Sequence, residues 1–240
     1  MKRRLARRLA WLVLAGLVGA VFMALGFWQL GRGAQKEAFL SRYQQASRHA
    51  PVPWAIAEAR LLEIGEDALP MRVQTFGHFD PSRQVVHDHR VHEGRAGVHV
   101  LSLFRPHQGR LRVLVNLGWA PFDRHTLPHP PLPKEAIEIQ GLLVAPPAVG
   151  WRLEQAAWEP GRVPLLLHLD LTRLSHDMGE PLAPAVLLLD AREPFGLLRE
   201  WKPLPNTLPP ERHRGYALQW FGLAATVWII ALVLLFRRHA

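Results

Sequence analysis

The sequence feature that most constrains this chain is an uncharged apolar run near its C-terminal end. From Tyr216 to Phe236 the residues are apolar, glycine or alanine, apart from Gln219 and Thr226. About 20 such residues are needed for a helix to cross a hydrocarbon core of about 30 Å. A basic pair, Arg237-Arg238, follows at once. The sequence therefore predicts a transmembrane helix over 216–236, followed by a short tail at 237–240.

A second apolar run lies near the N-terminal end. Residues 1–10 are basic, and residues 11–30 are apolar except for Gln29. A cleaved signal peptide has a similar pattern, but this run is long for one, and Trp28-Gln29-Leu30 does not resemble a small-residue cleavage site. A retained helix over 11–30 is favoured. Because Lys and Arg gather at both chain ends, both ends are expected in the cytoplasm, with residues 31–212 on the other side of the membrane.

The charge pattern and the lack of cysteine exclude several classes of function. The net charge is +9, but seven cations flank the two apolar runs, which leaves 22 Lys and Arg against 20 Asp and Glu elsewhere. The middle of the chain is thus nearly neutral and lacks the basic patch that nucleic-acid binding requires. The absence of cysteine excludes disulfides, thiolate catalysis and Cys-ligated metal centres.

The middle region has the pattern of a β-rich domain with a few helices. Helical patterns cover 31–48 and Trp54–Glu63, and Asp170 is a candidate N-cap for a short helix that Gly179 ends. Alternating patterns predict strands, with turns at Asp80-Pro81, Glu93-Gly94 and Gln108-Gly109; the predicted strands are 71–76, 84–91, 97–104, 111–117, 137–144, 165–169 and 185–189. We therefore expect an α+β membrane protein, in which two transmembrane helices flank one extracytoplasmic domain with a largely antiparallel sheet.

The two apolar runs are expected to pack side by side, since both must join the same domain. Small residues allow helices to approach closely in a membrane. Gly16, Ala20 and Ala24 recur every four residues on the first run, and Gly222 and Ala225 lie on the second. They are the predicted contact surface. Gln29 is expected to form a hydrogen bond with the neighbouring helix.

Four patches together resemble one family, the Surfeit locus (Surf/Shy) family of cytochrome c oxidase assembly factors. The patches are Leu25-Gly26-Phe27-Trp28-Gln29-Leu30-Gly31-Arg32 with Lys36, Val113-Leu114-Val115-Asn116-Leu117-Gly118-Trp119-Ala120-Pro121, Gly141-Leu142-Leu143 with Pro146-Pro147, and His213 with Tyr216, Ala217, Trp220 and Phe221. Their order and spacing cover nearly the whole chain. Two positions depart from the family pattern, because Leu117 replaces an arginine and Arg212 replaces an asparagine.

The resemblance implies a membrane-bound assembly factor and no enzyme. It implies transient binding of haem a and its insertion into the large subunit of the oxidase, with haem a synthase as a possible partner. A scaffold that holds an assembly intermediate without haem is the alternative. The location implied is a bacterial inner membrane with the domain in the periplasm; the corresponding mitochondrial location is the intermembrane space.

His213 is the residue that the resemblance implies as an axial haem ligand. Tyr216, Trp220 and Phe221, with Trp28 on the first helix, would line the porphyrin, and Arg32 and Lys36 would pair with its propionates. The same residues also fit an aromatic and basic belt at the membrane boundary, with no ligand at all.

The middle region contains two further groups of candidate residues. Asn116, Gly118 and Trp119 are expected to have mainly a structural role, with glycine in a tight turn and tryptophan packed over the sheet. His87, His89 and His92 have the composition of a metal site, but His87 and His89 share one face of a strand whereas His92 falls on the other face or in the turn, and no carboxylates converge with them; metal binding is not the favoured interpretation.

Overall fold

The computed structural model describes the chain except residues 1, 123–126, 147–157, 160–162, 202–207 and 237–240. Its elements are α1 (Lys2–Arg48), β1 (Val52–Pro53), α2 (Trp54–Ile64), a 3-10 turn (Gly65–Ala68), β2 (Met71–His92), β3 (Arg95–Pro106), β4 (Arg112–Pro121), β5 (Ile137–Val144), β6 (Leu165–Leu166), α3 (Leu171–Met178), β7 (Leu182–Leu189) and α4 (Pro210–Phe236). They form two compact units, one of residues 1–42 with 203–240 and the other of residues 43–202. The predicted α+β class, with apolar terminal helices and a β-rich middle, is confirmed.

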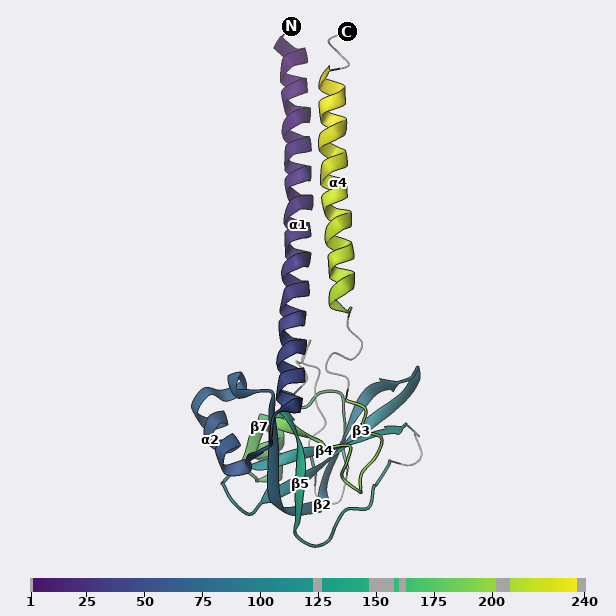
Figure 1. Ribbon diagram of the computed structural model, residues 1–240. Helices are drawn as coiled ribbons and strands as arrows, with labels where there is room; N and C mark the ends of the chain where they lie inside the picture. Colours follow the sequence, from purple (N-terminus) through teal and green to yellow (C-terminus); the bar gives the residue numbers. More distant parts are fainter. Residues whose placement is uncertain (1, 123–126, 147–157, 160–162, 202–207, 237–240) are drawn as a thin grey trace. The chain divides into compact units, whose positions relative to one another are not determined.

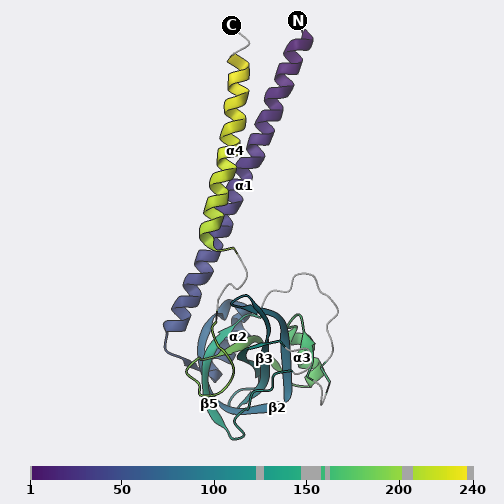
Figure 2. The same cartoon turned by 90° about the vertical axis from the view of Figure 1, so that its right-hand side faces the viewer.

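The first unit is a pair of long helices. Both α1 and α4 are long and apolar enough to cross a membrane. They run antiparallel and side by side in both views, so the start of α1 and the end of α4 lie at the same end of the pair (Figures 1 and 2). The predicted helix over 31–48 is confirmed as a continuation of α1 without a break.

Glycines spaced seven residues apart bring α1 against α4. Gly19, Gly26 and Gly33 are all buried. A Cβ built on Gly19 would overlap the ring of Trp228, and one on Gly26 would come within 2.6 Å of Phe221 Cδ1. Two alanines of α4 that are also seven apart, 217 and 224, are buried as well. A repeat of seven is the period at which two helices keep one seam in contact along their length.

The predicted contact surface with a spacing of four was wrong. Built Cβ atoms on Gly16 and Gly222 meet nothing within 4 Å, and Ala20, Ala24 and Ala225 are exposed. A spacing of four drifts around a helix relative to a repeat of 3.5, so those residues leave the seam after one turn. The predicted hydrogen bond from Gln29 to the neighbouring helix is confirmed, since its Oε1 lies 2.6 Å from His213 Nδ1.

The second unit is a β-barrel. Within the described residues the strands pair in the order β2–β3–β4–β7–β5, and β5 returns to pair with the first part of β2. β2 can close the sheet because it is long: Met71–Gly77 pairs with β5, and Gly77–His92 pairs with β3. Figure 2 shows the strands curling around a common centre. Closure leaves these strands with no free edges.

Alternating residues on the strands build two apolar cores. One fills the barrel, where inward side chains such as Phe104 and Leu187 meet Trp54 and Leu61 of α2. The other lies between the outer face and α3, where Leu103 and Leu114 pack on Leu174. The predicted caps of α3 are confirmed: the Asp170 side chain accepts a hydrogen bond from the backbone N–H of Arg173, and Gly179 ends the helix with a φ of 64°.

One predicted turn in the sheet was wrong. Asp80-Pro81 is not a hairpin turn, because β2 runs through it with only an irregularity in the pairing between Asp80 and Gln84. The Asp80 carboxylate accepts hydrogen bonds from Ser82, which gives a turn-like local pattern without reversing the chain. The expected antiparallel pairing of β2 with β3 and of β3 with β4 is confirmed, and β4 and β7 add a parallel pair to the sheet. The turn at Glu93-Gly94 is confirmed, with both residues at the positive φ that a two-residue hairpin favours.

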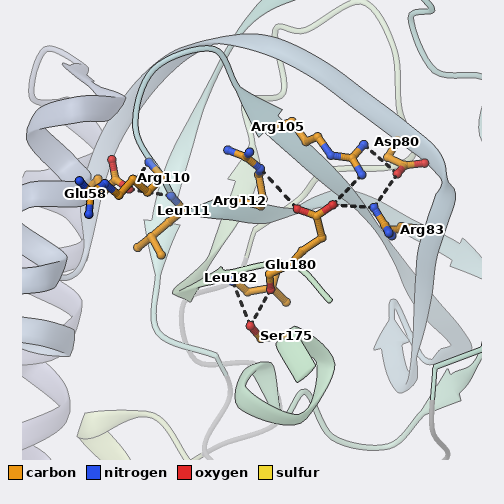
Figure 3. Close-up of polar contacts among 10 residues, drawn as sticks. All are labelled: Glu58, Asp80, Arg83, Arg105, Arg110, Leu111, Arg112, Ser175, Glu180 and Leu182. Atoms are coloured by element: carbon orange, nitrogen blue, oxygen red, sulfur yellow. Dashed lines mark hydrogen bonds and ion pairs between the residues drawn. The ribbon is translucent and has the colours of Figure 1, made fainter. Parts of the chain in front are cut away.

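Carboxylates link strands of the barrel to neighbouring segments (Figure 3). Glu58 of α2 accepts hydrogen bonds from the backbone N–H groups of Arg110 and Leu111, both at 2.6 Å, and so holds the turn between β3 and β4. On the other side, two carboxylates pair with three arginines in one network, which contains Asp80, Glu180, Arg83, Arg105 and Arg112. Burial raises the pKa of Glu180, but the hydrogen bond from Arg105 and the nearby positive charges outweigh it and lower the pKa overall.

Candidate functional site

His213 lies on the first turn of α4 and faces α1. Its side chain is 7% exposed and packs over Gly33, where a built Cβ would lie 3.4 Å from His213 Cβ. A glycine at position 33 therefore makes room for the imidazole between the two helices. Nδ1 lies 2.6 Å from Gln29 Oε1, whereas Nε2 is buried and has no hydrogen-bond partner among the described residues. A buried imidazole nitrogen without a partner is rare enough to need an explanation.

Aromatic side chains follow His213 along the seam. Trp220 packs on Phe22 of α1 with ring centres 5.5 Å apart, and Phe221 meets Phe27 edge to face at 5.3 Å. Tyr216 and Trp28 are instead exposed, at 38% and 57%. The predicted aromatic residues thus divide into two groups: Trp220 and Phe221 hold the helices together, while Tyr216 and Trp28 face outward.

The two predicted cations also differ in their surroundings. Lys36 lies one turn beyond Gly33, and its Nζ donates a hydrogen bond to the backbone carbonyl of Leu208 at 2.6 Å. Arg32 is exposed and donates to Gln35 on its own helix. A third cation, Arg214, forms an ion pair with Glu37 between the helices. The structure therefore brings Lys36 and His213 to the same seam and leaves Arg32 directed outward.

A second polar cluster lies inside the β-domain and joins β2 to β3. His87 and His99 are directly opposite each other on these strands. Arg90 donates a hydrogen bond to one nitrogen of the His87 ring, and Trp119 donates its indole N–H to the Arg90 carbonyl at 2.9 Å. His92 lies against the Trp119 ring with centres 5.2 Å apart. Of the three histidines considered as metal ligands, His89 has a side chain outside the described residues.

His99 was not among the predicted site residues, and its role depends on a strand that is distant in sequence. The amide of Asn116 is oriented by Gly118, because the backbone N–H of Gly118 donates to Asn116 Oδ1 at 3.1 Å. The amide nitrogen of Asn116 then faces His99 Nδ1, also at 3.1 Å, and donates to it. His99 is thereby held neutral with its proton on Nε2. No local sequence signal marks His99, since the partner comes from β4.

Gly118 and Trp119 have the structural role expected of them, but in a different setting. They lie within β4, at a bulge where three residues from Asn116 to Gly118 face Val100-Leu101 of β3. Trp119 packs over Gly97 and pairs with Leu198 of the following segment. Leu117 is the extra residue of the bulge and its side chain is fully buried in the barrel core. Leucine at position 117, where the family pattern has arginine, therefore places an apolar side chain in the core. No charge is lost from a loop, because position 117 lies within β4.

The His87 and His99 pair predicts a loss of stability in mild acid. Burial, Arg90 and His99 lower the pKa of His87 to about 3, while burial, Arg90 and His92 lower the pKa of His99 to about 4. An unfolded histidine has a pKa of about 6.5, so the unfolded chain takes up protons first as the pH falls. The folded state keeps its full stability above pH 6.5. Between pH 7 and pH 5, protonation of each histidine in the unfolded chain should lower the free energy of unfolding by about 2 kcal/mol.

Urea unfolding of the full chain in detergent at pH 7 and pH 5 measures this loss. His87→Gln keeps an acceptor for Arg90 but cannot take up the proton, so it should lessen the loss on acidification by about 2 kcal/mol. His176→Gln is the matched control, because the His176 side chain is 91% exposed. Equal pH dependence in wild type and His87→Gln would contradict the assignment.

A model of the SURF1 family matches residues 16–225, which include most of α1, the whole described β-domain and the first part of α4. A search of curated proteins gave no significant match. The matched range contains His213, Gln29 and the bulge of β4.

Proposed function

Since this chain belongs to the SURF1 family, we propose that it binds haem a transiently and assists its insertion into the large catalytic subunit of cytochrome c oxidase. The family is associated with cytochrome c oxidase assembly, and its members act as assembly factors. Binding of haem a goes one step further than this association and needs its own support from the residues.

The observation that carries the proposal is the buried, unpartnered Nε2 of His213. An imidazole nitrogen is a common axial ligand of haem iron, and the iron offers it one coordination position. Ligation would satisfy the only polar atom of the His213 ring that the described structure leaves without a partner. Arg32 and Lys36 lie within one or two turns of Gln29 on α1 and would pair with the propionates. The residues present therefore fit a haem.

The aromatic residues would take different parts in binding. Tyr216 and Trp28 are exposed and would contact the porphyrin directly. Trp220 and Phe221 are packed against α1 and would support the site from behind, since moving them would disturb the contacts with Phe22 and Phe27. Lys36 would exchange its hydrogen bond with the Leu208 carbonyl for one with a propionate.

The burial of His213 makes tight, permanent binding unfavourable. Iron can reach Nε2 only if side chains in the seam move, and the loss of their packing would offset part of the bond energy. A ligand held in this way is exchangeable, as delivery to another protein requires. We place the helix pair in a bacterial inner membrane with the β-domain in the periplasm, and haem a synthase upstream as donor. The antiparallel arrangement of α1 and α4 and the basic chain ends support this orientation.

The test is an optical spectrum of the purified chain. It is co-expressed with the enzymes that make haem a, purified in mild detergent, and compared in reduced-minus-oxidised spectra with His213→Ala. We expect an a-type band in wild type and its loss in the variant, while His176→Ala on the exposed face of α3 keeps it. No band in wild type, despite haem a in the membranes, would overturn haem binding; a band that survives in His213→Ala would overturn the ligand.

A scaffold without haem is the second candidate, and one observation favours it. His213 already has a structural contact, because its hydrogen bond with Gln29 and its packing on Gly33 join the two helices. On this account the chain binds the large subunit and stabilises an assembly intermediate. The absence of a haem band, together with reduced oxidase content in cells lacking the protein, would support it.

A further inference from the structure

On the inner face of the helix pair, Gln29 Oε1 of α1 lies 2.6 Å from His213 Nδ1 of α4. We propose that Gln29 is a positioning residue that holds His213 in the Nδ1–H tautomer and thereby keeps the lone pair on Nε2 available to haem iron. This inference rests on the proposed function, since it concerns the same ligand. It adds a residue to the site and assigns the nitrogen that binds.

The tautomer follows from the chemistry of the two groups. A carbonyl oxygen can only accept a hydrogen bond, so the ring nitrogen that faces Gln29 Oε1 must carry the proton. A neutral imidazole has one proton, and Nε2 therefore has the free lone pair. Nε2 is also the nitrogen without a partner among the described residues. The hydrogen bond on one side of the ring and the unpartnered atom on the other are thus two consequences of a single arrangement.

The place of Gln29 on α1 supports a specific role. It lies between Gly26 and Gly33, both of which are on the buried seam, in a helix that is otherwise apolar from residue 11 to residue 30. A polar amide on such a face is unfavourable unless it has a partner. Gln219, by contrast, is exposed on α4 and cannot make this contact.

A neutral amide is also suited to a ligand that must be released. Partners of ligating histidines are commonly carboxylates or carbonyl oxygens, and they raise the basicity of the ring and fix its orientation. A carboxylate would make the imidazole a stronger donor to iron, and an amide has a weaker effect. Glutamine therefore orients His213 without strengthening the iron bond as far as a glutamate would, in agreement with transient binding.

The first experiment measures the tautomer in the haem-free chain. Ring-¹⁵N-labelled histidine is introduced into the full chain in detergent, and long-range ¹H–¹⁵N spectra are recorded at pH 8, where the ring is neutral. The His213 signals are identified by their loss in His213→Ala. We expect the Nδ1–H form in wild type and in Gln219→Leu, and a shift toward the Nε2–H form in Gln29→Leu. The Nε2–H form in wild type would overturn the inference whether or not haem binds.

The second experiment measures haem a binding and its midpoint potential after co-expression. Loss of an outer partner of a ligating histidine typically lowers affinity about 10- to 100-fold, so Gln29→Leu should lose most of its haem. Gln29→Glu keeps an acceptor and should restore binding. The remaining haem in Gln29→Leu should have a higher potential than wild type, and that in Gln29→Glu a lower one, because a stronger hydrogen bond makes the ring a better donor to ferric iron.

The outcomes separate this inference from the proposed function. No haem in wild type overturns the proposed function and the ligand role of Gln29 with it. Haem in wild type with unchanged occupancy and potential in Gln29→Leu, relative to Gln219→Leu, overturns the inference alone. If Gln29 had a purely structural role, both Gln29 variants would bind less haem, and their midpoint potentials would not shift in opposite directions. That result would also overturn the inference.

Discussion

Replacing Gly118 with alanine should remove several kcal/mol from the stability of the β-domain. Gly118 has a φ of 122°, a conformation that residues with a Cβ rarely adopt, at a cost of about 1–3 kcal/mol. A built Cβ would also lie 2.6 Å from the backbone oxygen of Leu198 and 2.9 Å from the backbone carbon of Leu197. Backbone cannot move aside as a flexible side chain can, so an overpacking cost of about 1–3 kcal/mol adds to the strain. A typical domain has about 5–15 kcal/mol in total.

Gly65→Ala is the matched control for this prediction. Gly65 also has a positive φ, 60°, but a Cβ there meets nothing within 4 Å. Gly65→Ala should introduce the backbone strain without the close contact. The difference in lost stability between the two variants therefore gives the cost of contact with the Leu197-Leu198 segment, which lies close to β4. Both variants are compared with wild type by urea unfolding of the full chain in detergent, followed by tryptophan fluorescence. Equal losses in Gly118→Ala and Gly65→Ala would show that this approach does not constrain position 118.

The bulge around Gly118 illustrates what could not be predicted from the sequence. The strand predicted over 111–117 is confirmed as part of β4, which is buried along most of its length; successive side chains of a strand point to opposite faces with a period of two. A bulge changes that period by one residue, and only its pairing with β3 reveals it. Leu117, the extra residue of the bulge, is fully buried in the core. Register depends on the partner strand, which local patterns do not specify.

The site in the helix pair was more accessible to sequence reasoning than the one in the barrel. Gln29 stood out because polar side chains are rare in apolar helices, and its predicted contact with the other helix is confirmed. His213 was marked by the family resemblance. The cluster of His99, Arg90 and Asn116 has no such marker, because its members come from three strands of a mixed sheet. The glycine seam did leave a signal in the sequence, namely the spacing of seven between Gly19, Gly26 and Gly33.

That seam gives the second large prediction: Gly26→Leu should separate α1 from α4 near Phe221. A Cβ at position 26 would come within 2.7 Å of Phe221 Cζ, and a leucine side chain would extend into the ring itself. The ring has little room to move, since it already packs edge to face on Phe27. In a membrane no hydrophobic effect drives two apolar helices together, so their association depends on close packing of this kind. An overpacking cost of about 1–3 kcal/mol should lower the ratio of paired to separated helices about 5- to 150-fold.

The absence of natural cysteine allows a direct measurement by disulfide formation. A Cβ at position 33 lies 3.4 Å from His213 Cβ, close to the separation of about 3.5–4.5 Å found in disulfides. The double variant Gly33→Cys with His213→Cys should therefore cross-link readily under mild oxidation. Gly31→Cys with His213→Cys should not, because a Cβ at position 31 meets nothing within 4 Å.

Adding Gly26→Leu to the Gly33 and His213 cysteine pair should slow its cross-linking about fivefold or more, by the packing cost given above. Adding Gly16→Leu should leave the rate unchanged, since a Cβ at position 16 has open space around it. The control matters because leucine at either position makes α1 more apolar, and only position 26 meets α4. If Gly16→Leu slowed the reaction as much as Gly26→Leu, the contact between the helices would have to include the surface that contains Gly16, Ala20 and Ala24. If Gly26→Leu left cross-linking unchanged, the Phe221 ring would have to move aside without separating the two helices. That outcome would contradict the prediction that the contact of Gly26 with Phe221 excludes a side chain at position 26.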